Sequence, residues 1–594
     1  MSLSPPSSDV HKGEQAAFRA LDPKVDQRTD RRRALSLGRM YALVAAFAVF
    51  CSLPGLFALP PLDRDESRFA QATAQMLETG DYVRIQFQDD ERNKKPVGIH
   101  WLQATSVKAF SSVEAREIWA YRLPSVLGIT LACLFIAAIA GHTYGPLPGL
   151  VAGLLLASAP VAMGEATIAK TDAMLLAAIT AAQGTLAFLF LRRGSLNEGL
   201  PNQEREPAFV VVSIFWIALA VSILIKGPIG PLVSGLTIIC LKLRYPKWQL
   251  IRSLKPHFGV AILAIIVMPW LIGIGIATEG RFFAEALGGD MAGKIGTSQE
   301  HHGGPPGYHF VLVWFLLWPA AALLPMAAIS AWKRRHQKVV WFLISWILPA
   351  WLIFEVTATK LPHYTLPLYP ALILLTLRTL RGGVVSQHRR AHRVGLLVYG
   401  AVSLLAISLL IIIPAYFNAP SLRLPGAMFA ALITGLCGAS LWLHTHRRPM
   451  QGTVLACVAS ACFGIAILQF ILPSIATLTV SQQLNRMIDE ADLHALHDGA
   501  LPTLISGYRE PSAVFLLGTE TGFAGGEATA RRAADERATA SSRPRAIAIE
   551  ERHLARFEEQ ATLNGLELRV LGVIKGLNYS NGDDIQLTVY RVEK

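Results

Sequence analysis

Residues 208–225 read AFVVVSIFWIALAVSILI, a run of eighteen residues without a charged side chain. A helix needs roughly 20 mostly apolar residues to cross the hydrocarbon core of a bilayer. Twelve further stretches of this kind occur, and they are residues 41–61, 124–142, 147–163, 172–191, 228–241, 258–277, 309–330, 339–357, 364–377, 395–415, 426–443 and 452–473. This pattern predicts a polytopic α-helical membrane protein with about thirteen transmembrane helices.

The composition excludes an ordinary soluble protein, because 52% of the 594 residues are hydrophobic and only 16% are charged. The 55 Lys and Arg residues indicate the orientation. With a cytoplasmic N-terminus, cytoplasmic segments hold 27 of them, outer loops 15 and the C-terminal tail 13. Short loops rich in Lys and Arg stay in the cytoplasm. The net charge of +13 is therefore explained by orientation and by attraction to anionic membrane lipids, without a nucleic acid partner.

The segments outside the spans suggest three parts. Residues 1–40 are polar and basic and are expected to form a disordered cytoplasmic tail. Residues 41–475 are expected to form the transmembrane domain. Residues 480–594 alternate helix-like and strand-like pieces and predict a small α/β domain on the outer side, with 525–542 as a flexible insert. All six cysteines lie in or beside apolar spans, so neither disulfides nor a CxxC metal site is indicated.

Two outer loops are too long to be simple connections. The first, residues 62–123, should contain a helix that is capped by Asp65 or Ser67 and ends at Gly80, and a second short helix around Trp119. The second long outer loop is residues 278–308. It includes His301-His302, which with His309 make a weak metal candidate because adjacent histidines rarely chelate one ion and no Cys or close carboxylate completes the set.

Ionisable residues gather at the outer ends of the predicted helices. They are Asp63, Asp65, Glu66, Arg68, Lys94, Lys95, Glu165, Lys170, Asp172, Lys226, Arg281, Glu355, Lys360, His363 and Tyr364. Charges beside a bilayer are costly unless they pair or bind something. A carboxylate among such cations can take a proton from an acceptor hydroxyl, while the cations stabilise a departing phosphate. Each residue also has a plainer interpretation, such as a solvated loop for Asp65, a lipid-facing anchor for Lys95 and an interfacial aromatic for Tyr364.

An ordered set of motifs resembles one known family. The motifs are Asp65-Glu66-Ser67-Arg68-Phe69-Ala70, Gly80-Asp81, Asn93-Lys94-Lys95-Pro96-Val97-Gly98 with Trp101, Tyr121-Arg122-Leu123-Pro124, Ala169-Lys170-Thr171-Asp172-Ala173, Lys226-Gly227-Pro228 and Thr359-Lys360-Leu361-Pro362-His363-Tyr364-Thr365-Leu366-Pro367. They are similar to those of the bacterial 4-amino-4-deoxy-L-arabinose lipid A transferases and their relatives, which are akin to the protein O-mannosyltransferases. The resemblance runs from about residue 55 to residue 475.

The resemblance implies a GT-C fold in the bacterial inner membrane and an inverting transfer of a sugar from a polyprenyl-phosphate donor to a lipid, glycan or protein acceptor of the envelope. It implies that Asp65 is the catalytic carboxylate, with Arg68 beside it, and that Asp172 is a second acidic residue of the cavity. It also implies that Lys95 and Tyr364 contact the donor phosphate. Since polyprenyl phosphate is the leaving group, the chemistry requires neither ATP nor a metal, and no Walker-type loop is present.

Three further cations are candidates for substrate binding. Lys360 lies in the last motif, and Arg281 is a candidate phosphate clamp by its place in the second long loop. Lys94 marks a departure, because the aminoarabinose transferases typically have Glu just before the Lys of the Lys-Pro pair. This change adds positive charge beside the presumed phosphate, and it suggests an acidic sugar or acceptor.

Two functions of other classes compete with the transferase. A secondary transporter or lipid flippase would tend to place ionisable groups near the membrane midplane, whereas this chain concentrates them at the outer helix ends. A scaffold with an outer binding domain would leave the motif of the first loop unexplained.

Overall fold

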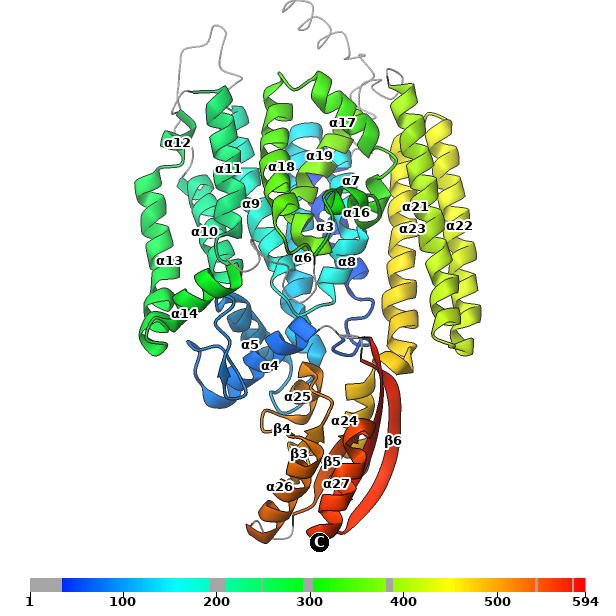
Figure 1. Cartoon of the computed structure of the whole chain (residues 1–594). Coiled ribbons are helices and arrows are strands. Elements are labelled where there is room, and N and C mark those ends of the chain that lie inside the picture. The colour runs from blue at the N-terminus through cyan, green and yellow to red at the C-terminus, as the bar shows by residue number, and fades with distance from the viewer. Residues whose placement is uncertain are drawn as a thin grey trace, which may run out of the picture.

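The computed structural model describes residues 35–62, 64–192, 209–246, 249–291, 303–380, 388–539, 543–578 and 582–592. Most of the predicted tail 1–40 therefore lies outside the described residues, as do Asp63, His301 and His302. The chain is a bundle of membrane-length helices with a separate α/β domain at one end (Figure 1).

In the described part of the chain, eight helices are long and apolar enough to cross a membrane. They are α6 (Ile118–Tyr144), α9 (Asp172–Arg192), α10 (Phe209–Lys226), α13 (Pro256–Ala277), α18 (Lys338–Val356), α21 (Arg389–Tyr416), α22 (Arg423–Thr445) and α23 (Pro449–Ile465), which continues through η6 (Ala466–Ile471) and η7 (Leu472–Ser474). A ninth is obtained if α7 (Pro146–Ala157) and α8 (Pro160–Ala166), bent by 65°, form one span. The multi-pass membrane fold is confirmed.

The predicted number of thirteen spans is not confirmed, because four of the apolar stretches form short or broken helices. They are α3 (Leu37–Ser52), α11 (Ile229–Arg244), the pair α16 (Tyr308–Leu316) and α17 (Leu324–Lys333), and η4 (Pro362–Leu368) with α19 (Tyr369–Thr379). Between α16 and α17 the chain makes the 3₁₀ turn η3 (Trp318–Ala320), where Pro319 lacks an N–H for the helical ladder. This irregular backbone is fully buried, which is where a membrane protein tolerates it.

The first outer loop supplies the layer between the bundle and the C-terminal domain (Figure 1). It contains α4 (Arg64–Thr79), the hairpin β1 (Gln86–Phe87) and β2 (Asp90–Glu91), and α5 (Gly98–Phe110). The predicted end of α4 at Gly80 is correct, but α4 begins at Arg64, so Asp65 and Ser67 lie inside it and neither caps it. The predicted short helix around Trp119 is the first turn of α6, which continues past Pro124. Pro124 has no N–H to donate to the carbonyl oxygen of Ala120, and that oxygen accepts from the Ser106 hydroxyl at 2.6 Å.

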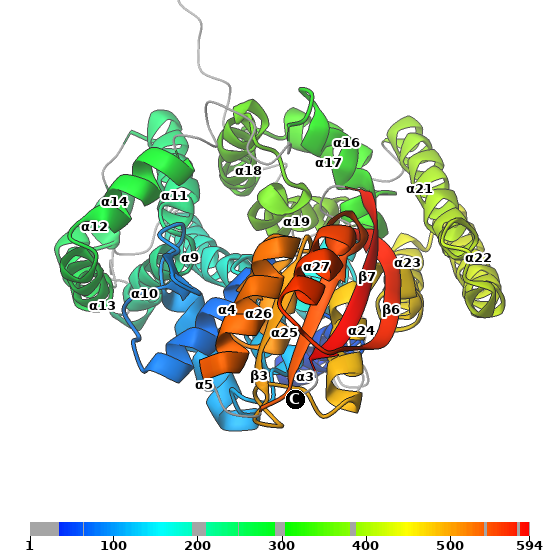
Figure 2. The same ribbon diagram turned by 60° about the horizontal axis from the view of Figure 1, so that its bottom comes forward.

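The C-terminal domain has a five-stranded mixed sheet. Its elements are α24 (Val480–Glu490), β3 (Leu501–Ser506), α25 (Pro511–Leu517), β4 (Gly522–Phe523), α26 (Gly526–Thr539), β5 (Arg545–Glu550), α27 (Glu551–Leu563), β6 (Leu568–Asn578) and β7 (Asp583–Val592). The strand order is β4-β3-β5-β7-β6, with β3 parallel to β4 and β5, and β7 antiparallel to β5 and β6. When the molecule is turned so that this end comes forward, the C-terminal domain lies in front of the middle of the bundle (Figure 2).

The prediction of a flexible insert at 525–542 is wrong, since most of it forms α26. Its alanines favour a helix, and Ala530 and Ala533 are buried against α27. The pairs Glu527–Arg531 and Arg532–Glu536, four residues apart, support the helix further.

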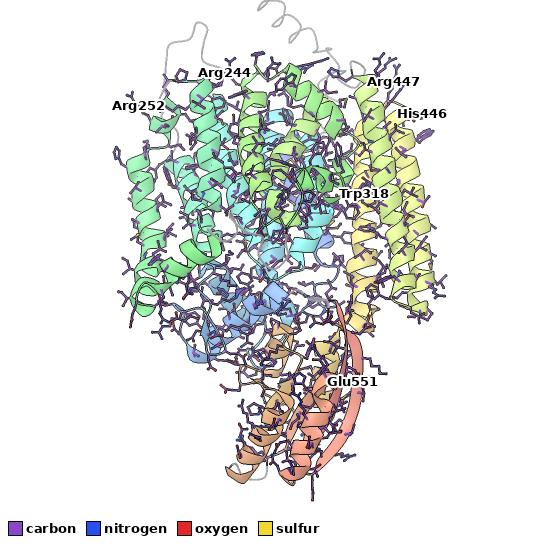
Figure 3. The ribbon with its side chains drawn as sticks, viewed as in Figure 1. Arg244, Arg252, Trp318, His446, Arg447 and Glu551 are labelled. Carbon is purple, nitrogen blue, oxygen red and sulfur yellow. The ribbon has the colours of Figure 1, made fainter. Side chains whose placement is uncertain are left out.

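Basic residues mark the end of the bundle opposite the C-terminal domain. Arg244, Arg252 and Arg447 lie at that end, far from Glu551 of the C-terminal domain (Figure 3). The first outer loop and the C-terminal domain thus share one side of the bundle, and the Arg-rich connections share the other (Figure 1).

Candidate active site

Asp65 lies in the first turn of α4, between two arginines. Arg68, one turn further along α4, places Nη1 3.5 Å from Oδ1 of Asp65. Arg92, which follows the β1–β2 hairpin, places Nη2 3.4 Å from the same oxygen and stacks its guanidinium 4.8 Å from the ring centre of Phe69. Half of the Asp65 side chain (49%) is exposed, so a substrate can reach this carboxylate although it is paired.

The cations around Asp65 keep it ionised. Desolvation raises the pKa of this carboxyl, but the positive charges of Arg92, Lys170 and Arg68 outweigh that effect and hold the pKa at about 2. Asp65 is therefore a carboxylate, ready to accept a proton, at any pH that a cell envelope meets.

Replacing Arg92 by Met should shift the acid limb of the pH–rate profile upward. Arg92 is the strongest of the charges that lower the pKa of Asp65, and without it the desolvation that raises this pKa remains. We expect the pH at which kcat/KM falls to half on the acid side to rise by about one unit or more. The profile of Arg84→Met, an exposed arginine of the same loop, provides the control. Identical acid limbs for Arg92→Met and wild type would contradict the pairing.

A buried ion pair next to Asp65 fixes the start of α4. Glu66 and Arg122 of α6 form a bidentate pair at 2.7 and 2.9 Å, and their side chains are 2% and 1% exposed. Arg122 also donates to the carbonyl oxygens of four residues that precede α4, which are Gly55, Leu56, Leu59 and Pro60. Glu66 accepts the backbone N–H of Ala169 at 2.8 Å. One ion pair thus joins α4, α6 and the loop that leads to Asp172.

Asp172 begins α9 and is neutralised by Lys226, the last residue of α10, at 2.5 Å. His363 of η4 bridges two carboxylates, with Nε2 3.7 Å from Asp172 and Nδ1 3.3 Å from Glu165. Lys226 also lies over the ring of Tyr364, with Nζ 5.6 Å from its centre. Because Asp172 is only 7% exposed and paired, it is better suited to position Lys226 than to take a proton.

The structure brings the two carboxylate clusters together through Lys170, a buried lysine whose charge acts on both Asp65 and Asp172. The predicted residues Asp65, Arg68, Asp172 and Tyr364 therefore belong to adjoining clusters.

The remaining predicted residues are Lys360, Arg281, Lys94 and Lys95. Lys360 donates to the carbonyl oxygen of Gly304 at 2.9 Å. Arg281 pairs with Glu91 of β2 at 3.0 Å and is 60% exposed. Lys94 is exposed and Lys95 half-buried, in the turn between the hairpin and α5. Arg281 and Lys94 are thus exposed, whereas Lys360 holds the loop at Gly304.

Sequence reasoning left Arg92, Lys170, Lys226 and His363 out of the predicted site. Arg92 carried no signal of its own, since it lies outside the matched motifs and its role depends on how the hairpin folds back onto α4. Lys170, Lys226 and His363 lay within matched motifs, and each is an ionisable group near the end of an apolar stretch, where the cost of an unpaired charge implies a partner.

A group that could hold a metal lies outside this site. In the described ranges, the ligand-type side chains close enough to share an ion are Asp489, His494 and His497 of the C-terminal domain. Nδ1 of His494 accepts the N–H of Leu496 and its Nε2 lies 3.2 Å from the carbonyl oxygen of Leu516, so a metal would have to displace one of these bonds.

His309, the described member of the weaker histidine candidate, likewise has both nitrogens engaged. Its Nδ1 lies 3.1 Å from a carboxylate oxygen of Glu355, and its Nε2 lies 3.2 Å from the carbonyl oxygen of Leu361.

The proteins to which this chain is similar are named as sugar transferases. Residues 94–272 match the family model of dolichyl-phosphate-mannose-protein mannosyltransferases. The undecaprenyl phosphate-α-4-amino-4-deoxy-L-arabinose arabinosyl transferase of Pseudomonas paraeruginosa is 26% identical over 71% of this chain and 74% of its own length. The corresponding enzyme of Pseudomonas aeruginosa PAO1 is 26% identical over the same shares.

The fold agrees with these matches. The crystal structure of ArnT from Cupriavidus metallidurans bound to undecaprenyl phosphate superposes with a TM-score of 0.69 over 94% of this chain and 98% of that chain, at 17% sequence identity. The chain is a glycosyltransferase of the GT-C fold. A transporter is not favoured, and the clusters around Asp65 and Asp172 are the candidate active site of this glycosyltransferase.

Proposed function

We propose that this glycosyltransferase moves a sugar from a polyprenyl-phosphate donor to a hydroxyl of a cell-envelope acceptor, a lipid A-like lipid or a glycan. The observation that carries the proposal is the half-exposed Asp65 carboxylate, held ionised by Arg68, Arg92 and Lys170 beside the paired Asp172 and Lys226. The arabinosyl transferase relatives, whose names specify an undecaprenyl-phosphate donor, support this choice of donor.

The proposed reaction is a single inverting displacement. The acceptor hydroxyl oxygen attacks the anomeric carbon of the sugar, and the bond between that carbon and the phosphate oxygen breaks. The hydroxyl proton passes to Asp65, and the electron pair of the broken bond leaves with the polyprenyl phosphate. A carboxylate at hydrogen-bond distance from the attacking hydroxyl is what such a step requires.

The cations of the site are proposed to stabilise the departing phosphate. Lys95 and Tyr364 are proposed to contact it, and Lys226 lies against the Tyr364 ring with a position set by Asp172. Fixed positive charges aimed at developing negative charge lower the barrier without reorganisation. Lys94 and Arg281 are proposed to meet other parts of the substrates at the rim. The leaving group is already a stable phosphate, so the reaction is proposed to need no metal.

The reaction is proposed to take place on the outer face of the bacterial inner membrane. Arg244, Arg252 and Arg447 lie at the end of the bundle opposite the C-terminal domain (Figure 3). By the positive-inside rule, the Arg-rich end faces the cytoplasm, and the site and the C-terminal domain face the periplasm. Nucleotide sugars are absent there, so a donor delivered by the membrane fits the location.

The decisive experiment is mass spectrometry of envelope lipids and glycans from cells with the wild-type gene, with a deletion and with Asp65→Asn. We expect one sugar-sized mass to disappear in both mutants while the Asp65→Asn protein stays at its normal level in the membrane. If the deletion removes a modification that Asp65→Asn retains in full, the assignment of Asp65 fails. If neither changes any sugar-bearing species, transfer itself is the wrong function.

Lys94→Glu should alter substrate preference more than protein level. Lys94 is exposed beside Lys95, so it adds a positive charge where the relatives typically carry a negative one. We expect the variant to transfer an acidic sugar less well, or to transfer less well to an acidic acceptor. Competition between charged and neutral acceptors in one reaction measures this preference. Lys108→Glu, on α5 of the same loop, is the matched control. Unchanged preference in Lys94→Glu would reject the charge argument.

A further inference from the structure

The turn at residues 518–521 of the C-terminal domain contacts both elements that carry the charged groups around Asp65. It lies between α25 and β4 and reaches α4 on one side and the tip of the β1–β2 hairpin on the other. Neither α4 nor the hairpin belongs to the C-terminal domain, so the turn is a physical link between that domain and the site.

On the α4 side, the contact is centred on the hydroxyl of Thr519. This hydroxyl accepts a hydrogen bond from the side-chain amide of Gln71 at 2.7 Å and donates to the Glu78 carboxylate at 2.7 Å. Arg116, which is nearly fully buried, pairs with Glu78 and donates to the side-chain oxygen of Gln71 at 3.0 Å. Gln71 and Glu78 are two turns apart on α4, so Thr519 fixes the helix along its length and not at one point.

On the hairpin side, the contact is made by Gln88. Its side-chain amide donates to the carbonyl oxygens of Thr519 at 3.0 Å and Thr521 at 2.8 Å. Gln88 has a φ of +55°, in the left-handed region that a non-glycine residue enters at a cost. Gln75 of α4 holds this backbone by bonding both its N–H and its carbonyl oxygen, at 2.9 and 2.7 Å. The tip of the hairpin is therefore held between α4 and the C-terminal domain.

The strand that leaves this tip leads directly to the charged groups of the site. It carries Glu91, which pairs with Arg281, and is followed by Arg92, which pairs with Asp65, and by Lys95. Moving the tip relative to α4 moves Arg92 relative to Asp65, since Asp65 lies on α4 itself. An ion pair at 3.3 Å between Arg64 of α4 and the buried Glu510 holds the first residue of α4 to the C-terminal domain.

From these contacts we infer that Thr519 and Gln88 are positioning residues for the transfer reaction, and that the C-terminal domain uses them to set the distance between Asp65 and Arg92. The inference rests on the proposed function, because it assigns a role to the surroundings of Asp65. It gives the C-terminal domain a part in catalysis without any contact with the substrate.

The polar contacts that Thr519 and Gln88 make are called the clamp below. They can be removed without detaching the C-terminal domain. A separate apolar contact joins the C-terminal domain to α6. Phe515 of α25 is fully buried, and its ring packs edge-on against the ring of Tyr121, with 5.2 Å between the ring centres. Ala70 and Ala74 of α4 belong to the same buried cluster. Variants that remove only the polar contacts of the turn should therefore leave the domain docked.

The test compares Gln88→Glu and Thr519→Val with wild type. Gln88→Glu sets a carboxylate against two carbonyl oxygens, and Thr519→Val removes the hydroxyl at nearly constant volume. Initial rates are measured in proteoliposomes, with the lipid extract of the deletion strain as the source of donor and acceptor. We expect kcat to fall about tenfold in each variant, with the apparent KM within about twofold of wild type, because a small misplacement of catalytic groups acts on the chemical step.

The pH profile separates positioning from a loss of folded protein. Asp65 is faced by Arg92 from the hairpin, Arg68 from α4 and Lys170 from the loop before α9. If the clamp fixes the position of Arg92, the acid limb of the kcat/KM profile moves to higher pH in Gln88→Glu and Thr519→Val, as in Arg92→Met. Thr519→Ser keeps the hydroxyl and should retain the wild-type rate. The control variants Thr562→Val and Gln560→Glu make the same two kinds of change on α27 and should also retain the wild-type rate.

Two results would overturn the inference: wild-type kcat with an unmoved acid limb in both clamp variants, or a rate that falls only in proportion to the folded protein. Asp65→Asn is measured in parallel. If it loses transfer while the clamp variants do not, only the positioning role fails. If Asp65→Asn keeps the wild-type rate, the proposed role of Asp65 fails, and the positioning role fails with it.

Discussion

Arg122→Met is expected to lower the free energy of unfolding by about 3–5 kcal/mol, the cost of breaking a buried ion pair by removing one partner. Arg122 is 1% exposed and its partner Glu66 is 2% exposed, so neither water nor another cation can readily replace the lost guanidinium. Met has a similar length and is apolar, and it leaves the Glu66 carboxylate buried without its counter-charge.

The effect should extend beyond the ion pair itself. Arg122 donates to four backbone carbonyl oxygens in the segment that precedes α4, between Gly55 and Pro60. A buried carbonyl that loses its donor carries a desolvation penalty. Because Asp65 is adjacent to Glu66, we also expect Arg122→Met to impair transfer in the fraction of protein that remains folded.

Unfolding in mixed micelles of a denaturing and a non-ionic detergent measures the change. Arg531→Met serves as the control, since Arg531 and its partner Glu527 are both more than half exposed on α26. Surface pairs of this kind contribute about 0–1 kcal/mol. Equal losses for the two arginine variants would contradict the structural role of the buried pair.

The apolar pattern predicted the membrane helices well, because a bilayer demands long uninterrupted runs. It did not show where those runs bend. Residues 309–330 form one apolar stretch in the sequence, yet the chain breaks at Trp318–Ala320. A hydropathy pattern does not reveal such a break, because a buried proline turn is as apolar as the helix it interrupts. The strand β5 (Arg545–Glu550), in contrast, can be read from the sequence, because two alanines alternate with two isoleucines between Arg545 and Glu550.

The proximity of two site residues could be predicted from the sequence only where both lie in the same short motif. Asp65 and Arg68 lie one turn apart on the same helix, so their proximity followed from local sequence. Arg92 and Asp65 are 27 positions apart, and their pairing depends on a hairpin whose strands are only two residues long. Such short strands have no periodicity to detect. Thr519 and the residues of α4 that it contacts are still further apart in the sequence, and no local pattern predicts their contacts.

Asp65→Asn is expected to lower kcat by about 10³-fold, within the range that general bases contribute. Asn keeps the size of the side chain and can still accept a hydrogen bond from Arg92 or Arg68, but it cannot take the proton of the acceptor. Since the pKa of Asp65 is about 2, the wild-type residue is ionised throughout the working range. The loss should therefore be the same at pH 5 and at pH 8.

Asp172→Asn should behave differently, and this contrast separates the roles of the two carboxylates. Asp172 is buried against Lys226, so its removal displaces a cation that is proposed to act near the donor phosphate. We expect a loss of about tenfold in kcat/KM, mostly through kcat, because a displaced cation stabilises less of the negative charge that develops on the departing phosphate.

Chemical rescue gives the sharper test of the base. Asp65→Ala opens space beside Arg68 and Arg92, where formate can bind as a mobile carboxylate. We expect formate to restore part of kcat in Asp65→Ala and none in Asp172→Ala, since only the first position is exposed and meets the acceptor. Rescue of Asp172→Ala alone would exchange the two roles, making Asp172 the base and Asp65 the residue that holds the cations.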